Sequence, residues 1–202
     1  MTRTGISEGL SAPLGSVTTG RLVFKRGASR LSIGADASME DLYRASFEGK
    51  VPRFDVDGGT VTVTYRLGLH PPTGVITLSG RIPWSIEGHM GMSDVAVNLE
   101  ATRLLDLDIG GGSSKMDLRL PRPDGTVRLR IGGGASRMQI VRPPDVPVSV
   151  RVGGGASHLT VDDVEIEAAA GKTEWRSPGY ETASDRYDID IGVGASAITV
   201  RA

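Results

Sequence analysis

The residues of this 202-residue chain best suited to binding are its arginines, which are unevenly distributed. Between residues 119 and 151, seven arginines stand against two acidic residues, whereas nine acidic residues follow between 162 and 190. A surface rich in arginine attracts anionic partners such as wall polymers, lipid headgroups or acidic proteins. The candidate anion surface consists of Arg119, Arg122, Arg128, Arg130, Arg137 and Arg151.

The competing interpretation is that these arginines neutralise acidic residues on neighbouring strands. Asp106 and Asp108 precede Arg128 and Arg130 by one repeat length, and Asp190 falls in the same position of its repeat as Arg151. Opposite charges on adjacent strands contribute about 0.2–1 kcal/mol each, and a one-residue slip would turn them into the core. We favour this structural interpretation for most of the arginines.

Catalytic and metal-binding motifs are not found in the sequence. It has no cysteine, which excludes disulfides and thiolate metal sites, and its net charge is −1. It also lacks the GxSxG and HExxH patterns and paired catalytic carboxylates. The three histidines, His70, His89 and His158, lie far apart in the sequence. We expect a non-enzymatic protein without cofactor, metal or nucleic-acid partner.

A Gly-Gly-Gly-Ala/Ser-Ser motif recurs in the chain, and glycine-rich turns can bind phosphate or calcium. It occupies residues 110–114, 132–136 and 153–157, and in altered form 192–196. Phosphate loops lead into helices, whereas apolar-alternating strands follow these turns. Calcium-binding β-rolls supply an aspartate in each turn, where this motif has alanine or serine. We therefore expect the glycines to form tight corners through positive φ angles, with the serines as turn caps.

One acidic cluster remains as a weak cation candidate. It contains Asp162, Asp163, Glu165 and Glu167. Clusters of carboxylates can bind calcium, but a solvated strand face explains this one better.

The strands that carry these residues are visible as a period-two pattern around each turn. Apolar residues stand two and four positions after the closing serine, as Met116 and Leu118 do, with mostly polar residues between them. The first three turns are 22 and 21 residues apart. A short period with a constant turn predicts a single-domain parallel β-solenoid, with coils of about 21 residues stacked roughly 4.8 Å apart. Met116, Met138 and Leu159 should then form one continuous core column.

Two parts of the chain depart from this regularity. Residues 1–20 read as a flexible segment, 21–83 as an irregular part of the solenoid domain and 84–202 as its regular coils. Within the irregular part, residues 38–47 resemble a short helix with Ser38 as N-cap, residues 57–63 a further coil and residues 75–78 a strand. Residues 171–186, the excess in the gap between Ser157 and Ser196, should form a loop packed over an edge or side.

The sequence also supports expectations about location and assembly. No signal peptide or membrane span is recognisable, so a cytoplasmic protein is expected; the alternative is an extracytoplasmic part of a longer envelope protein. The chain stops directly after the predicted strand 197–200, which would leave an open sheet edge. Open edges invite pairing, so we expect homo-oligomers formed through this edge.

The pattern resembles a known bacterial family. The run Gly27-Ala-Ser-Arg-Leu-Ser-Ile, then Pro52-x-Phe-x-Val and Thr60-Val-Thr-Val, resembles the N-terminal part of the toast-rack domain. The ending Tyr-Asp-Ile-Asp-Ile-Gly-Val-Gly-Ala-Ser-Ala-Ile-Thr-Val200 is similar to that domain and to the related putative-adhesin repeats.

This resemblance covers about residues 20–202. The family includes the soluble part of LiaF-type proteins, which act in bacterial envelope-stress signalling. It implies a protein-interaction or sensory module without catalytic residues, although the membrane segments of the longer members are missing from this sequence. A self-assembling β-helical scaffold of the bactofilin type is the alternative.

Overall fold

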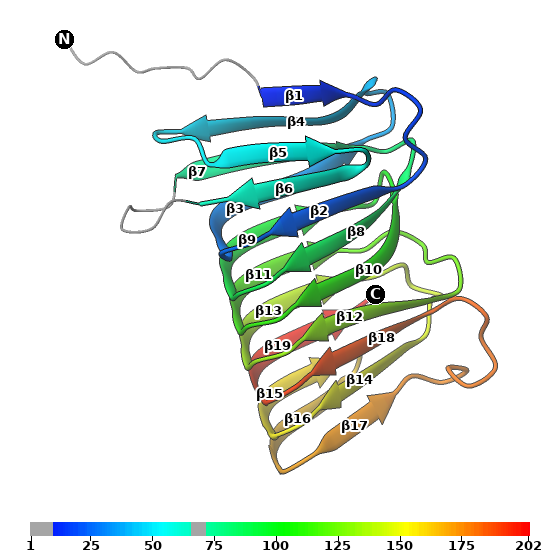
Figure 1. Ribbon diagram of the computed structural model, residues 1–202. Coiled ribbons are helices and arrows are strands. Elements are labelled where there is room, and N and C mark those ends of the chain that lie inside the picture. The colour runs from blue at the N-terminus through cyan, green and yellow to red at the C-terminus, as the bar shows by residue number, and fades with distance from the viewer. Residues whose placement is uncertain (1–9, 66–71) are drawn as a thin grey trace.

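Two long β-sheets face each other along the molecule (Figure 1). The computed structural model describes residues 10–65 and 72–202, and within these ranges every regular element is a strand. The ten-stranded sheet A has the order β1 (Leu10–Pro13), β4 (Asp41–Glu48), β7 (Thr73–Ser79), β3 (Ala28–Asp36), β9 (Met92–Asn98), β11 (Ser113–Arg119), β13 (Ala135–Val141), β19 (Gly194–Arg201), β15 (Gly155–Val161) and β16 (Val164–Ala170).

Sheet B has nine strands and lies opposite. Its order is β17 (Thr173–Arg176), β14 (Val148–Val152), β18 (Arg186–Ile191), β12 (Thr126–Ile131), β10 (Arg103–Ile109), β8 (Pro83–Gly88), β2 (Gly20–Phe24), β6 (Thr60–Thr64) and β5 (Arg53–Asp57). Most neighbours in both sheets are parallel, and each coil contributes one strand to each sheet. The all-β class is confirmed, and the arrangement is that of a flattened β-solenoid.

The core lies between the sheets and is built from aliphatic columns. Met116 is in register with Met138, Met138 with Ile198, and Ile198 with Leu159. All four side chains are at most 2% exposed. Full burial of such a side chain stabilises the fold by about 1.5–3 kcal/mol. The predicted column exists, but Ile198 stands between Met138 and Leu159.

That insertion shows that the coils do not stack in sequence order. The last coil, β18 and β19, lies between the coil β12–β13 and the coil β14–β15. Asp190 is in register with Arg130 on one side and with Arg151 on the other. Direct pairing of β12 with β14 would place those two arginines side by side, and like charges directly opposite are destabilising. The charge pattern therefore favours the insertion.

The N-terminal end follows the same plan. The first coil, β2 and β3, lies between β8–β9 and β6–β7. Residues 57–60 connect β5 and β6 as an antiparallel hairpin, so the prediction of a coil around this turn is corrected. Residues 75–78 form part of β7, as predicted. Leu10–Pro13, inside the segment expected to be flexible, pairs as β1 with β4.

The helix predicted for residues 38–47 is wrong, because Asp41–Glu48 forms strand β4. The backbone N–H and the hydroxyl of Ser38 both donate to Asp36 Oδ1, at 2.8 and 2.6 Å. The supposed N-cap therefore belongs to a local turn of the kind aspartate favours. After that turn, buried residues at 43, 45 and 47 repeat every second position, and this alternation specifies a strand.

Antiparallel strands close both ends of the solenoid. At one end β4 pairs with β7 and β5 with β6; at the other β16 pairs with β15 and β17 with β14. Residues 173–176, predicted as part of a loop, instead form the edge strand β17 of sheet B. The C-terminal strand β19 is an interior strand, so the open edge predicted there does not exist.

Several of the repeated glycines are required by close packing between turns. An added Cβ on Gly133 would lie 2.6 Å from Gly112 N, and one on Gly153 would lie 2.3 Å from Gly192 O. Neither residue has a positive φ, so the conformational reason expected for these glycines is wrong. Successive turns instead approach so closely that a side chain does not fit between them.

Candidate interaction surface on sheet A

Positive φ angles recur at the position directly after the turn serine in six coils. The residues are Arg30, Asp94, Lys115, Arg137, Ala197 and His158, with φ between 50° and 57°. Each is skipped by the strand register, since Ser114 pairs with Ser136 and Met116 with Met138. These six coils therefore carry the same one-residue bulge, and all six side chains are exposed. We call this set the bulge column.

The bulge column is costly for residues with a side chain. The left-handed conformation disfavours a non-glycine residue by about 1–2 kcal/mol. Glycine would avoid that penalty, yet five of the six positions carry a charged side chain or histidine. Strained backbone of this kind is concentrated at functional sites. The column is therefore the first candidate for a binding function.

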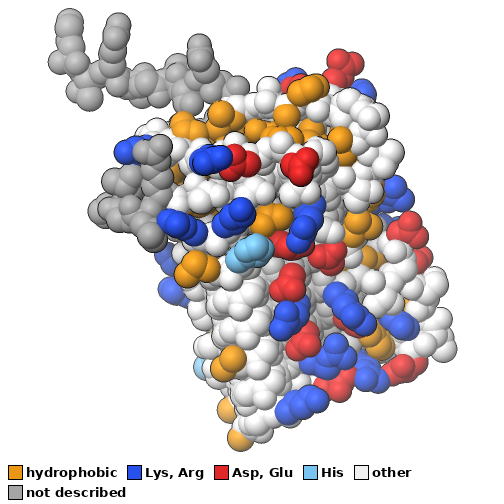
Figure 2. All heavy atoms as spheres, in the orientation of Figure 1, with side chains coloured by type: hydrophobic (Ala, Val, Ile, Leu, Met, Phe, Trp, Pro, Cys, Tyr) orange, Lys and Arg blue, Asp and Glu red, His pale blue; other side chains and the backbone are white. Residues whose placement is uncertain are grey.

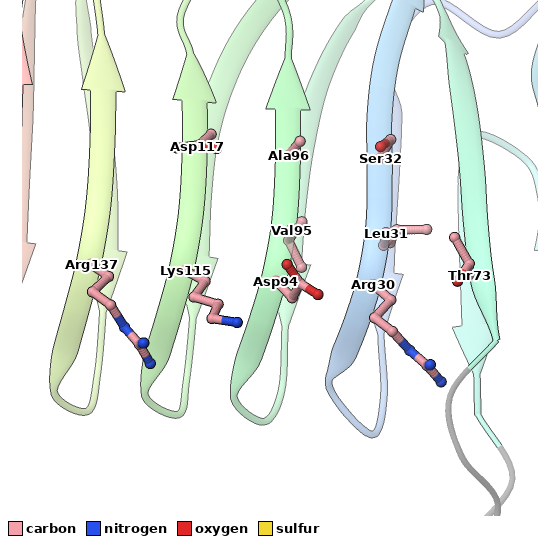
Figure 3. Close-up of a pocket in the computed structure, with 10 residues that line it drawn as sticks. All are labelled: Arg30, Leu31, Ser32, Thr73, Asp94, Val95, Ala96, Lys115, Asp117 and Arg137. Atoms are coloured by element: carbon pink, nitrogen blue, oxygen red, sulfur yellow. The ribbon is translucent and has the colours of Figure 1, made fainter.

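A trough lies beside the bulge column on the outer face of sheet A (Figure 3). One hollow of about 590 Å³ is lined by Arg30, Leu31, Ser32, Thr73, Asp94, Val95, Ala96, Lys115, Asp117 and Arg137. A second hollow of about 320 Å³ shares Ser32, Ala96 and Asp117 with it and adds residues such as Gly34 and Arg119. Together they form one shallow depression across β7, β3, β9 and β11, with a floor of small side chains.

The charges around the trough are predominantly positive. Arg30, Lys115 and Arg137 line one side, where Figure 3 shows their side chains in a row on neighbouring strands, and Arg119 lies farther along. Asp94 and Asp117 are the two acidic members. None of the six forms a side-chain ion pair with another residue of the described ranges. The trough thus carries an excess of cations, four against two acidic residues, with Asp94 on the strand between Arg30 and Lys115.

Sheet B differs, because opposite charges face each other across most of its neighbouring strands. One register column reads Glu174, Arg151, Asp190, Arg130, Asp108 and Glu87. Arg130 Nη1 lies 3.4 Å from Asp108 Oδ2. Figure 2 shows basic and acidic side chains interspersed on this face. From Glu174 to Asp108 the charges of sheet B form a ladder of opposite signs, which favours this strand order and register, whereas Asp108 and Glu87 at its end carry the same sign.

Arg21 and Glu87 make the closest of these contacts. Arg21 donates two hydrogen bonds to the Glu87 carboxylate, from Nε to Oε1 and from Nη2 to Oε2, each at 2.6 Å. This hydrogen bonding lowers the pKa of Glu87 below its ordinary value.

The six arginines predicted as one surface are divided between different parts of the molecule. Arg128, Arg130 and Arg151 belong to the ladder on sheet B. Arg122 pairs with Asp145 at 2.6 Å in the turn region. Only Arg119 and Arg137 reach the trough.

The sequence prediction omitted Arg30 and Lys115, which complete the basic side of the trough. The signal was present, since both follow a turn serine in the repeat alignment. Arg30 and Lys115 could be chosen only by knowing that the residue after each turn serine bulges outward and that the first coil stacks beside β9.

The turn serines form a second column next to the bulges. Ser136 is in register with Ser196, and Ser196 with Ser157, whose hydroxyl donates to Ser196 Oγ at 3.1 Å. A shallow hollow of about 470 Å³ beside them is lined by glycine, alanine and serine alone. The serines therefore support one another across strands.

The other candidate residues do not assemble into a site in the part of the chain that the structure describes. His158 lies at the end of the bulge column beyond Ala197, and His89 Nε2 lies 3.8 Å from Glu87 Oε2. His70 falls outside the described residues. Among residues 10–65 and 72–202, no group of three or more histidine or acidic side chains could hold a metal ion. The same residues contain no helix long and apolar enough to cross a membrane.

Comparison with known proteins shows a likeness of fold. No family model matches the sequence, and no curated protein matches it. Among solved structures, the chain is similar to a protein from Clostridium sporogenes ATCC 15579 described as a "putative cell adhesion protein". The TM-score is 0.67 at 17% identity, over 96% of this chain and 98% of that one. At this identity the likeness shows that the two share a fold.

Proposed function

We propose that the protein is a non-catalytic interaction module of the bacterial envelope-stress or surface type, which binds a protein partner through the trough on sheet A. The likeness to the clostridial protein supports a surface or interaction role. The resemblance to toast-rack and LiaF-type domains adds the envelope-stress context. In this proposal the module acts at the cell envelope, and fractionation of cells carrying an epitope-tagged protein tests that location.

The observation that carries the proposal is the difference between the two outer faces. The ladder on sheet B matches its charges with opposite charges on adjacent strands. The trough places Arg30, Lys115 and Arg137 on strained backbone without an ion-pair partner among the described residues. Internal charge matching contributes to stability, whereas exposed unmatched charges contribute little to it and leave a field that attracts a partner.

Charge reversal tests this assignment. The trough variant is R30E/K115E/R137E, and the control R53E/R103E/K172E changes three exposed basic residues elsewhere to give the same net charge. Immobilised wild-type protein should retain a specific partner from membrane and envelope extracts of the source bacterium. The trough variant should lose that partner and the control should keep it. Equal retention by both variants would refute the assignment to sheet A.

The alternative is a self-assembling scaffold, or a smaller homo-oligomer, formed through a sheet edge. Edge strand β16 favours this, because Val164 is 42% exposed and the sequence VEIEAAA contains no proline. The antiparallel strands at both ends favour a discrete module over an end-to-end polymer. Light scattering and sedimentation decide between them: filaments would support the scaffold, and a strict monomer at high concentration would exclude both forms of assembly.

A further inference from the structure

We propose that the trough recognises an extended polypeptide segment of net acidic charge, which lies along the solenoid axis with two acidic residues four positions apart. This inference rests on the proposed function and specifies the chemistry of the partner. It follows from the order of charges along the bulge column, from strand spacing and from the residues that line the trough.

The charge order runs across four adjacent strands. Arg30 lies on β3, Asp94 on β9, Lys115 on β11 and Arg137 on β13. With neighbouring strands about 4.8 Å apart, the last three lie about 5, 10 and 14 Å from Arg30 along the column. The column therefore presents a cation, an anion and then two adjacent cations.

An extended peptide fits this order when its acidic residues are suitably spaced. Side chains on one face of an extended chain repeat every two residues, about 6.7 Å, so positions i and i+4 are about 13 Å apart. An acidic residue at i would meet Arg30, and one at i+4 would lie between Lys115 and Arg137. Arginine can hold a carboxylate through two parallel hydrogen bonds. The residue at i+2 lies between Asp94 and Lys115, where a basic or hydroxyl side chain fits.

The floor of the trough suits a chain lying flat on it. Ser32, Gly34 and Ala96 keep it low, and Val75, which is 47% exposed, offers an apolar contact. Serine and threonine hydroxyls on the floor can donate to backbone carbonyls or accept from backbone N–H groups. The floor therefore accommodates a peptide backbone beside the bulge column.

The lining disfavours the other polyanions. Bases of single-stranded nucleic acids stack on aromatic side chains, and the residues that line the two hollows include none. Asp94 and Asp117 would repel a polymer that carries a negative charge on every unit. A polypeptide can alternate acidic with neutral or basic residues, and only such a ligand matches both signs in the trough.

Peptide titrations monitored by amide NMR test the proposal with the full chain. The probe is the peptide Ser-Glu-Ser-Lys-Ser-Glu-Ser, capped at both ends, and the control peptide has the same composition with the two glutamates adjacent. The probe should shift amides of β3, β9, β11 and β13 and should bind at least about fivefold more tightly than the control, the effect of one strong exposed ion pair. Added salt should weaken binding.

The charge variants and a competing polymer complete the test. R30E/K115E/R137E should abolish the shifts, and R53E/R103E/K172E should preserve them. Shifts confined to sheet B, or equal binding of both peptides, would overturn the inference. If heparin or an oligo-dT binds the trough and the peptide does not, the polypeptide inference falls while the proposed interaction surface stands. If none of these probes binds the trough, the acidic-partner inference also falls, and the extract experiment decides the proposed function separately.

Discussion

Replacing Gly133 by alanine should destabilise the protein, because the turn at this position has no room for a methyl group. An ideal Cβ would lie 2.6 Å from Gly112 N, 2.8 Å from Gly112 Cα and 2.9 Å from Gly111 C. All three atoms belong to the backbone of the adjacent turn, so no side chain can rotate away. Overpacking of this kind costs about 1–3 kcal/mol. The neighbouring turns would have to move apart, which weakens the ladder of hydrogen bonds between them.

Gly34→Ala is the matched control. Gly34 lies in β3 without a positive φ, and no heavy atom would come within 4 Å of an added Cβ. Reduced freedom of the unfolded chain should make this variant more stable by about 0.4–1 kcal/mol. The two variants should therefore differ by about 1.5–4 kcal/mol in the free energy of unfolding.

Urea unfolding followed by circular dichroism measures the difference between these variants. Gly133→Ala should also lower the melting temperature by several degrees, at about 2–4 °C per kcal/mol for a chain of this size. Equal midpoints for Gly133→Ala and Gly34→Ala would refute the close-packing explanation of the repeated glycines.

Three further predictions concern charges. Asp190→Arg should lower the free energy of unfolding by about 1–3 kcal/mol, because it replaces two favourable cross-strand pairs by repulsion; an unchanged urea midpoint would contradict the ladder. Asp162→Asn should cost about 1–3 kcal/mol, since the Arg142 side chain, 4% exposed and 2.5 Å from Asp162, would lose its counter-ion; a loss under about 0.5 kcal/mol would count against this role. The Arg21 hydrogen bond lowers the pKa of Glu87 in the folded state below the ordinary glutamate pKa of 4.5. The Arg21–Glu87 pair therefore stabilises the fold fully above pH 4.5, and this stabilisation is lost as the pH falls through the lower folded pKa. Arg21→Gln should flatten that acid dependence in unfolding measured from about pH 6 to 3, and identical slopes would argue against the pair.

The candidate site was only partly accessible to sequence analysis. Arg137 could be chosen from its place in the arginine-rich stretch, and the trough contains it. Arg30 lies more than one hundred residues away in the chain, and only the stacking of the first coil beside β9 brings it to the same face. Pairing between distant strands is a long-range property that local spacing does not encode.

The sequence by itself determined the strand pattern, the residues of the core and the inward or outward direction of each side chain. These are local consequences of a two-residue period. The pattern misled at residues 38–47, where cap-like residues precede the alternation, and it missed the hairpin at residues 57–60 and the strand Thr173–Arg176. The tertiary structure decided which coil lies next to which. Met138 can pack equally well beside Leu159 or Ile198, because every coil presents the same aliphatic pattern. Charge favours the observed order, since Asp190 separates two arginines that would otherwise repel each other.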